Sequence, residues 1–284
     1  MWYNKRLVNS GQWAVNDPPA DGREQKEFLY DGERLMSGHS KWSTIKHKKA
    51  ATDAKRGKVF TRLAKEITVA AREGGGDLDV NVRLRLVVDK AKAANMPKDN
   101  IERAVKRGTG ELEGGELYEY VYEAYGPHGI GIVIETVTDN KNRSVAELRH
   151  ILNKYGGAMA EAGSVVWQFT RKGYIGVTGD PDQDELFLVA ADAGAEDIRF
   201  EDGMAEIFTE LEQLQAVRNV LDENGFELDE VSVIYDPNNA IELGGHEAVQ
   251  VLRLVEYLEE LDDVQDVYTA LEINDEALAA MEMA

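Results

Sequence analysis

The amino-acid sequence predicts an α+β protein of three domains: an N-terminal helical domain followed by two ferredoxin-like, antiparallel sheet-plus-helix domains, the third inserted in the second. The chain has 284 residues, 43% of them hydrophobic, which is enough for two or three hydrophobic cores. The hydrophobic pattern changes from helical spacing before residue 112 to alternation after residue 117. Charge changes at the same place, because residues 36–112 carry 18 basic and 9 acidic side chains whereas residues 113–284 carry 9 and 38.

The first 35 residues are predicted to be a disordered or loosely packed extension. They contain Pro18 and Pro19, scattered polar residues and little periodicity. The character of the sequence changes at Met36, so one hypothesis is that translation begins there. Mass spectrometry of the native protein would test this hypothesis, and a peptide from residues 1–20 would exclude it.

Residues 36–112 are predicted to form a basic helical domain of about four helices. Ser43 is a suitable N-cap for a short helix over about 44–52, and a longer helix follows over about 53–73. Residues 79–95 fit both strand and helix spacing, and their Ala- and Lys-rich end favours helix. A last short helix is expected between Pro97 and Gly108.

The helix over about 53–73 has two separate faces. At 100° per residue, one face collects the apolar side chains Val59, Phe60, Leu63, Ile67, Ala70 and Ala71. The other face collects Lys55, Lys58, Arg62, Lys65 and Arg72. The pattern therefore predicts a helix that packs on its partners with one side and presents a basic ridge on the other.

The acidic part of the chain is predicted to contain two sheet-and-helix domains. Residues 118–170 read as two strands, a helix over about 144–155 and another strand. Residues 173–237 read as βαββαβ, the ferredoxin-like plan. A helix over about 247–261 and a strand over 264–273 then complete the earlier unit, and the tail from Asn274 is expected to fray.

The predicted boundaries follow from this order of elements. The acidic α+β domain spans 113–170 plus 240–284, and the inserted ferredoxin-like domain spans 171–239. The Gly-rich, acidic run at 108–116 is expected to link the helical domain to the rest.

The most informative stretch is residues 39–65, where nine of 27 residues are Lys or Arg and Asp53 is the only acid. Lysine and arginine neutralise phosphates and release condensed counterions, so a polyanion is the chemistry that this stretch favours. Two alternatives remain open, namely a solvated helix face that aids solubility and a surface for an acidic protein partner.

Composition excludes several classes of function. The chain has no cysteine, so disulfides, thiolate metal sites and cysteine nucleophiles are excluded. No nucleophile elbow, Walker motif, HExxH pattern or cluster with metal-ligand spacing is present. No apolar run could span a bilayer, and the first residues lack the apolar core of a signal peptide. We therefore expect a cytoplasmic protein that is not an enzyme, with no catalytic residue, metal, cofactor or membrane partner.

Several stretches carry a specific resemblance. They are MSGHSKWSTIKHKKAATDAKRGKVFTRLAKEI from Met36, LRLVVDKAKAANMPKDNIERAVKRGTG, TDNKNRSVAELRHILNKYGG and SVVWQF. Over residues 36–275 the chain resembles the YebC family. His128 stands where the family has a glycine in a GPGG turn, and residues 1–35 precede the resemblance.

The resemblance implies one helical and two α+β domains around a cleft, and work on nucleic acid in gene expression. Bacterial members are described as probable transcriptional regulators that bind DNA. A mitochondrial relative is a translational activator for a cytochrome oxidase subunit, and the family is linked to ribosomes and elongation.

The candidate nucleic-acid-binding residues combine the basic stretch, matched to the family motif, with a polar loop before the helix at about 144–155. They are Lys41, Trp42, Lys46, His47, Lys48, Lys49, Lys55, Arg56, Lys58, Arg62 and Lys65, with Lys141 and Arg143 in the loop. The lysines and arginines would contact phosphates, while Trp42 or His47 would stack on an unpaired base. For Trp42 taken alone, an anchor packed on its own domain is the favoured interpretation. The loop could equally be a polar turn in which asparagine caps the helix.

The sequence thus favours a non-enzymatic nucleic-acid-binding regulator, with a DNA-binding transcriptional regulator as the first hypothesis. The alternative is a translation factor that uses the same surface on ribosomal or messenger RNA. In either case ribosomal or transcription proteins are expected as further partners of the acidic domains. A third hypothesis is a scaffold for protein interactions.

Overall fold

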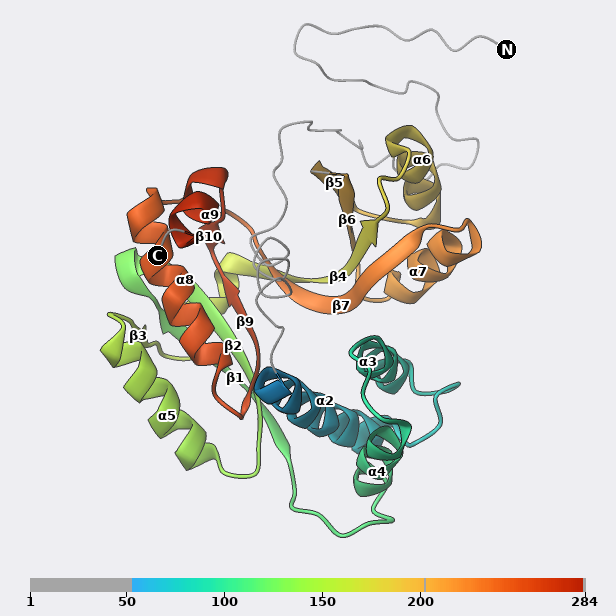
Figure 1. Ribbon diagram of the computed structural model, residues 1–284, viewed down its shortest axis with the longest axis horizontal. Coiled ribbons are helices and arrows are strands. Elements are labelled where there is room, and N and C mark those ends of the chain that lie inside the picture. Colours follow the sequence, from blue (N-terminus) through green and yellow to red (C-terminus); the bar gives the residue numbers. More distant parts are fainter. Residues whose placement is uncertain (1–52, 202, 283–284) are drawn as a thin grey trace, which may run out of the picture. The chain divides into compact units, whose positions relative to one another are not determined.

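The computed structural model describes residues 53–201 and 203–282 (Figure 1). The predicted extension 1–35 and the predicted helix over 44–52 lie outside these residues. The described chain forms two compact units, one spanning 173–231 and the other spanning 53–172 together with 232–282. No described helix is both long enough and apolar enough to cross a bilayer.

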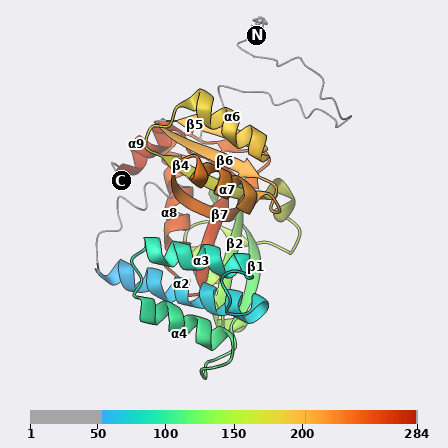
Figure 2. The ribbon, with the colours of Figure 1, turned by 90° about the vertical axis from the view of Figure 1, so that its right-hand side faces the viewer.

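Three helices form the first described part of the larger unit. They are α2 (Asp53–Gly74), α3 (Val82–Ala93) and α4 (Lys98–Gly108), and α2 lies between the other two (Figure 2). The predicted apolar face of α2 is confirmed, since Leu63 and Ile67 are buried in a core shared with α3 and α4. The ambiguous segment 79–95 is helical.

Asn81 explains why this ambiguous segment starts a helix. Its side-chain oxygen accepts a hydrogen bond from the backbone N–H of Leu84 (3.0 Å), which caps α3. Its side-chain amide donates to the carbonyl of Ala70 in α2 (2.8 Å). One buried asparagine therefore both begins α3 and holds it on α2.

Gly108 sets the closest approach between α2 and α4. A Cβ atom at this position would clash with the carbonyl oxygen of Thr68 and would lie 2.6 Å from Cβ of Ala71. The Thr68 hydroxyl also donates to the carbonyl of Ala104 (3.2 Å). The two helices are thus in backbone contact at this end of α4.

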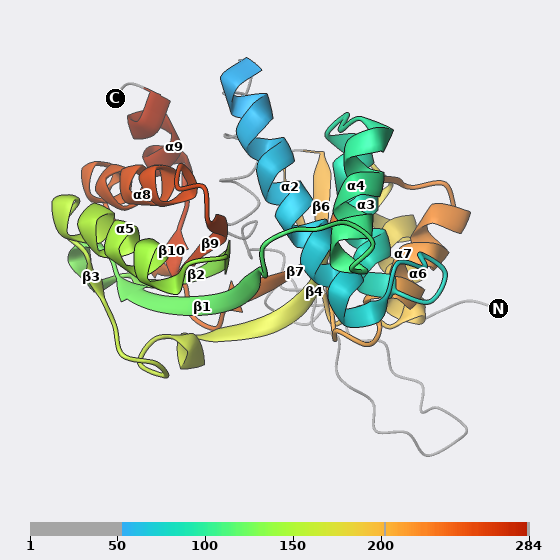
Figure 3. The same ribbon diagram turned by 90° about the horizontal axis from the view of Figure 1, so that it is seen from below.

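A four-stranded sheet forms the next part of the same unit. Its strands are β1 (Tyr118–Tyr125), β2 (Gly131–Thr138), β3 (Ala158–Met159) and β9 (Val264–Thr269), in the order β3-β1-β2-β9. Helices α5 (Lys141–Lys154) and α8 (Gly245–Glu259) cover one face of it (Figure 3). The core between them includes Ile134, Leu148 and Leu252.

The segment between β3 and the next long strand is fixed by one buried acid. It contains a short 3-10 helix, η2 (Val166–Gln168), where the sequence predicted strand. The carboxylate of Glu123 accepts backbone hydrogen bonds from Gly163 (2.6 Å), Val165 (2.6 Å) and Val166 (2.8 Å). Although burial alone would raise the pKa of Glu123, these three bonds lower it.

The prediction that the tail frays from Asn274 is wrong. Residues Asp275–Glu282 form α9, and Asn274 accepts a hydrogen bond from the backbone N–H of Ala277 (2.9 Å). Ala277 and Met281 are buried in the core with α8. Their four-residue spacing gives α9 an apolar face, so it packs rather than frays.

The predicted strand over 264–273 is also too long. It ends at Thr269, and Leu271–Glu272 forms a separate short strand, β10, that pairs in parallel with β8 (Ile241–Glu242).

The hairpin between β1 and β2 holds a second 3-10 turn, η1 (Pro127–Gly129), in which His128 has a φ of 60°.

The smaller unit has the ferredoxin-like order that the sequence predicted. Its elements are β4 (Phe169–Thr178), α6 (Gln183–Ala193), β5 (Asp197–Glu201), β6 (Met204–Thr209), α7 (Leu214–Glu223) and β7 (Glu227–Pro237). The sheet order is β5-β6-β4-β7, so the first strand lies beside the last. The edges of this compact unit fall inside β4 and β7. The domain boundaries 171 and 239 stay a prediction.

Candidate nucleic-acid interface

The structure describes only part of the predicted site. Lys41, Trp42, Lys46, His47, Lys48 and Lys49 lie outside the described residues. Lys55 belongs to α2, but its side chain is not described. Arg56, Lys58, Arg62 and Lys65 follow along α2, and Lys141 and Arg143 lie in the first turn of α5.

The described ridge of α2 contacts the segment 260–265, which comprises the connection from α8 to β9 and the first two residues of β9. Lys58 Nζ donates to the carbonyl of Glu260 (3.1 Å), and Arg62 Nη1 donates to the carbonyl of Gln265 (3.1 Å). Lys65 Nζ donates to the carbonyl of Asp262 (2.8 Å). Three candidate phosphate ligands therefore also hold α2 on the sheet part of the unit.

Asp263 joins the two groups of candidate residues. Its carboxylate accepts hydrogen bonds from Lys65 Nζ (2.8 Å), Arg143 Nη2 (2.7 Å), Ser144 Oγ (2.8 Å) and Thr138 Oγ1 (2.9 Å). Burial alone would raise the pKa of Asp263, but the hydrogen bonds from Lys65, Arg143 and Ser144 lower it to about 2. Asp263 is thus a buried anion shared by α2, α5 and the segment 260–265.

The predicted polar loop is largely the first turn of α5, which starts at Lys141 and not at about 144, and it has a clear local role. The side-chain oxygen of Asn140 accepts a hydrogen bond from the backbone N–H of Arg143 (3.2 Å) and caps α5. Lys141 places its ammonium 4.7 Å from the centre of the Tyr120 ring, a cation–π contact. These contacts orient the two predicted cations, and Arg143 turns toward Asp263.

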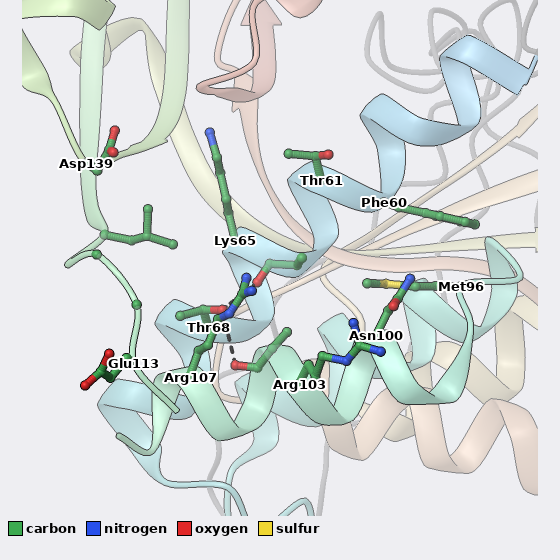
Figure 4. Close-up of a pocket in the computed structure, with 15 residues that line it drawn as sticks. Phe60, Thr61, Lys65, Thr68, Met96, Asn100, Arg103, Arg107, Glu113 and Asp139 are labelled. Atoms are coloured by element: carbon green, nitrogen blue, oxygen red, sulfur yellow. Dashed lines mark hydrogen bonds between the residues drawn. The ribbon is translucent and has the colours of Figure 1, made fainter. Parts of the chain in front are cut away.

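A pocket of about 590 Å³ lies between α2, α4 and the segment 113–117 (Figure 4). Five of its polar lining residues are Lys65, Asn100, Arg103, Arg107 and Glu113, and Asp139 lines it as well. Phe60 and Met96 contribute apolar surface. The pocket therefore combines basic, amide and aromatic groups in one place.

Sequence reasoning missed Arg103 and Arg107. Both are exposed on α4, four residues apart, and neither makes a hydrogen bond or ion pair with any described residue. Lys106, between them, is exposed in the same way. The signal was present in the sequence, because cations four residues apart share a helix face, here beside the face of the buried Ile101 and Ala104.

A group of acids lies where α2 meets β2 and β9. Burial and the neighbouring Asp266 raise the pKa of Glu135 to about 7. Burial likewise raises the pKa of Glu66 on α2. Across the described residues, no three His, Asp or Glu side chains are arranged to hold a metal ion.

Fold and site together define a class: an α+β protein that carries a basic helical domain ahead of two acidic sheet-and-helix domains. Comparison with known families agrees with the resemblance noted above. Residues 40–111 match the family model described as the TACO1/YebC protein N-terminal domain, and residues 117–271 match the TACO1/YebC second and third domain. The chain belongs to the TACO1/YebC family.

The chain matches individual relatives over nearly the whole of their length. A protein of Desulfatibacillum aliphaticivorans is 54% identical over 244 residues, which cover 86% of this chain and 99% of that protein. A protein of Thermotoga maritima is 51% identical over 245 residues, which cover 86% and 96%. Both are named "Probable transcriptional regulatory protein". The crystal structure of a conserved hypothetical protein from Aquifex aeolicus is similar, with a TM-score of 0.77 and 42% identity, covering 84% of this chain and 99% of that one.

Proposed function

We propose that this chain is a non-enzymatic, nucleic-acid-binding regulator of gene expression, and that its first target is DNA. The names of its relatives support a regulatory role in transcription. The observation that carries the proposal is the row of exposed cations on α4, Arg103, Lys106 and Arg107, none of which is paired with a described residue.

Charge distribution gives the physical reason. Residues 36–112 hold twice as many basic as acidic side chains, whereas residues 113–284 hold 38 acids against 9 bases. A strongly acidic body repels a polyanion, so the helical domain is the part that can approach phosphates. Binding would be driven mainly by the phosphate backbone, with little dependence on base sequence.

In this proposal the paired cations of α2 position the helical domain. Lys58, Arg62 and Lys65 are occupied by the segment 260–265, so they fix the helical domain in place. Among the described residues, the unpaired cations of α4 are then left for phosphate contacts. The lysines at 41–49, which lie outside the described residues, are part of the proposal on the ground of their charge. No catalytic residue, metal or cofactor forms part of the proposal.

The test measures binding of the full chain to a DNA duplex, an RNA of equal length and purified ribosomes over a range of salt. If about six phosphates are contacted, affinity should fall by roughly a factor of 10³ between 50 and 200 mM salt. The double variant Lys106→Glu and Arg107→Glu, which reverses two of the exposed cations on α4, should abolish binding. The matched control, Arg149→Glu with Lys154→Glu, reverses two charges outside the basic segment and should retain most of it.

The outcome separates the alternatives. Tight DNA binding with little ribosome association supports the proposal. Co-sedimentation with ribosomes without DNA binding would indicate that the same surface binds RNA and that the protein acts in translation. Equal losses in the test and control variants would remove α4 from the site.

A further inference from the structure

The pocket between α2 and α4 has the size of a small-ligand site. Its volume of about 590 Å³ lies within the range of roughly 300–1,000 Å³ that is usual for such sites. It is lined mainly by α2 and α4, together with the segment 113–117, Met96 and Asp139, so most of its wall is regular structure. A duplex is too wide to enter a space of this size, whereas a single nucleotide fits.

One part of the pocket is suited to an anion. Arg103 and Arg107 both line it, and neither has a partner among the described residues. Of the acids that line the pocket, Asp139 is already paired with Arg143 (3.0 Å), which leaves Glu113 as the carboxylate without a described partner. The α4 side therefore offers two free guanidinium groups, which bind phosphate oxygens with paired hydrogen bonds.

The other end is suited to a base. Figure 4 shows Phe60, Met96 and Asn100 together at the end of the pocket away from Glu113 and Asp139. Phe60 is only partly buried, so its ring retains surface for stacking. The side-chain amide of Asn100 makes no hydrogen bond with a described residue, and an amide can donate to and accept from a base edge.

We propose that this pocket seats one unpaired nucleotide of the bound nucleic acid. Its phosphate lies on Arg103 and Arg107, and its base lies against Phe60 and Met96 within reach of Asn100. The inference rests on the proposed function and deepens it, because it makes an unpaired position, rather than any stretch of backbone, the preferred point of attachment.

The experiment compares two DNA probes bound to the full chain at one salt concentration. One is a blunt duplex of 12 base pairs, and the other is the same duplex with one unpaired 2-aminopurine nucleotide at a 3′ end. We expect about ten-fold tighter binding to the second probe, since a stacked base contributes that order of affinity. We also expect quenching of the 2-aminopurine fluorescence on binding. The same pair of probes is made in RNA.

Matched variants assign the effect to the pocket. Arg103→Gln and Arg107→Gln should each remove most of the preference for the overhang. Lys106→Gln removes the same charge from α4 at a position that does not line the pocket. It should therefore weaken the binding of both probes by the same factor. Phe60→Leu keeps an apolar side chain but loses the ring, and it should abolish the quenching while blunt-duplex binding stays unchanged. Circular dichroism checks that each variant is folded.

The possible failures are distinct. Equal affinity for blunt and overhanging probes, or equal effects of Arg103→Gln and Lys106→Gln on both probes, overturns the pocket inference and leaves the proposed function standing. If neither DNA nor RNA binds in any form, the proposed function fails and the inference fails with it.

Discussion

Replacing Asp263 with asparagine tests the contact that holds the helical domain in place. The substitution keeps the shape of the side chain but removes the negative charge that Lys65 and Arg143 share. Asparagine retains one acceptor oxygen, so part of the hydrogen bonding survives. Two cations then face a neutral group in a site where the native carboxylate is only 3% exposed.

The magnitude follows from the pKa of Asp263. A carboxyl whose pKa falls from 3.8 in the unfolded chain to about 2 in the folded chain stabilises the fold at neutral pH; the size of this effect is roughly 2 kcal/mol. Removing one partner of a buried ion pair costs about 3–5 kcal/mol, and the retained oxygen of asparagine reduces that loss. We therefore expect a decrease of about 2–3 kcal/mol in the free energy of unfolding.

Urea unfolding of the wild type and the variant at a series of pH values measures this decrease. Because the folded pKa lies below the unfolded one, the wild-type advantage is present above pH 3.8 and is lost as the pH falls toward 2. Asp262→Asn is the control, since the exposed Asp262 contacts Lys65 through its backbone carbonyl, and it should change little. A loss for Asp263→Asn that equals the control, or that persists unchanged at pH 2, would refute this account.

Four further predictions concern stability and are checked by chemical denaturation. Glu135 has a folded pKa of about 7 against 4.5 unfolded, so the wild type should lose stability as the pH rises from 4.5 past 7; Glu135→Gln should be more stable than the wild type at pH 8 by about 1–3 kcal/mol and should flatten the profile. Gly108→Ala should cost about 1–3 kcal/mol, because its Cβ would collide with α2. Gly57→Ala has open space within α2 and should instead stabilise by about 0.5–1 kcal/mol, and a loss there would contradict the helical-propensity argument. Glu123→Gln should cost about 1–3 kcal/mol at pH 7, because it disturbs three backbone hydrogen bonds, and should cost less in acid, where the wild-type carboxylate is protonated.

The elements that the sequence predicted correctly are those with a strong local period. Leu63 and Ile67 lie four residues apart on α2, and both are buried where the helical wheel placed them. The βαββαβ order of the smaller unit was readable because its strands and helices alternate with short turns. Short amphipathic elements were harder to predict. Ala277 and Met281 form only one apolar face of one short helix, and that pattern was too brief to distinguish α9 from a frayed tail.

The site was less predictable than the fold. Charge density identified the basic face of α2, but no local pattern shows that Lys65 meets Asp263, which is 198 residues away. Asp263 was one of many acids in an acidic segment, and its burial depends on α2 and α5 together. Arg103 and Arg107 were overlooked for the opposite reason, because cations on the outside of an amphipathic helix are common and mark a site only once a pocket lies beside them.

The contact between Lys65 and Asp263 also has a consequence for timing. The two residues are 198 positions apart, and a ribosome adds about 5–20 residues per second. Roughly 10–40 s therefore pass between the synthesis of the lysine and that of its aspartate. During that interval α2 can fold with α3 and α4, but its lysine still lacks its anionic partner. The growing chain therefore carries its most basic part long before it gains the acid that fixes this part.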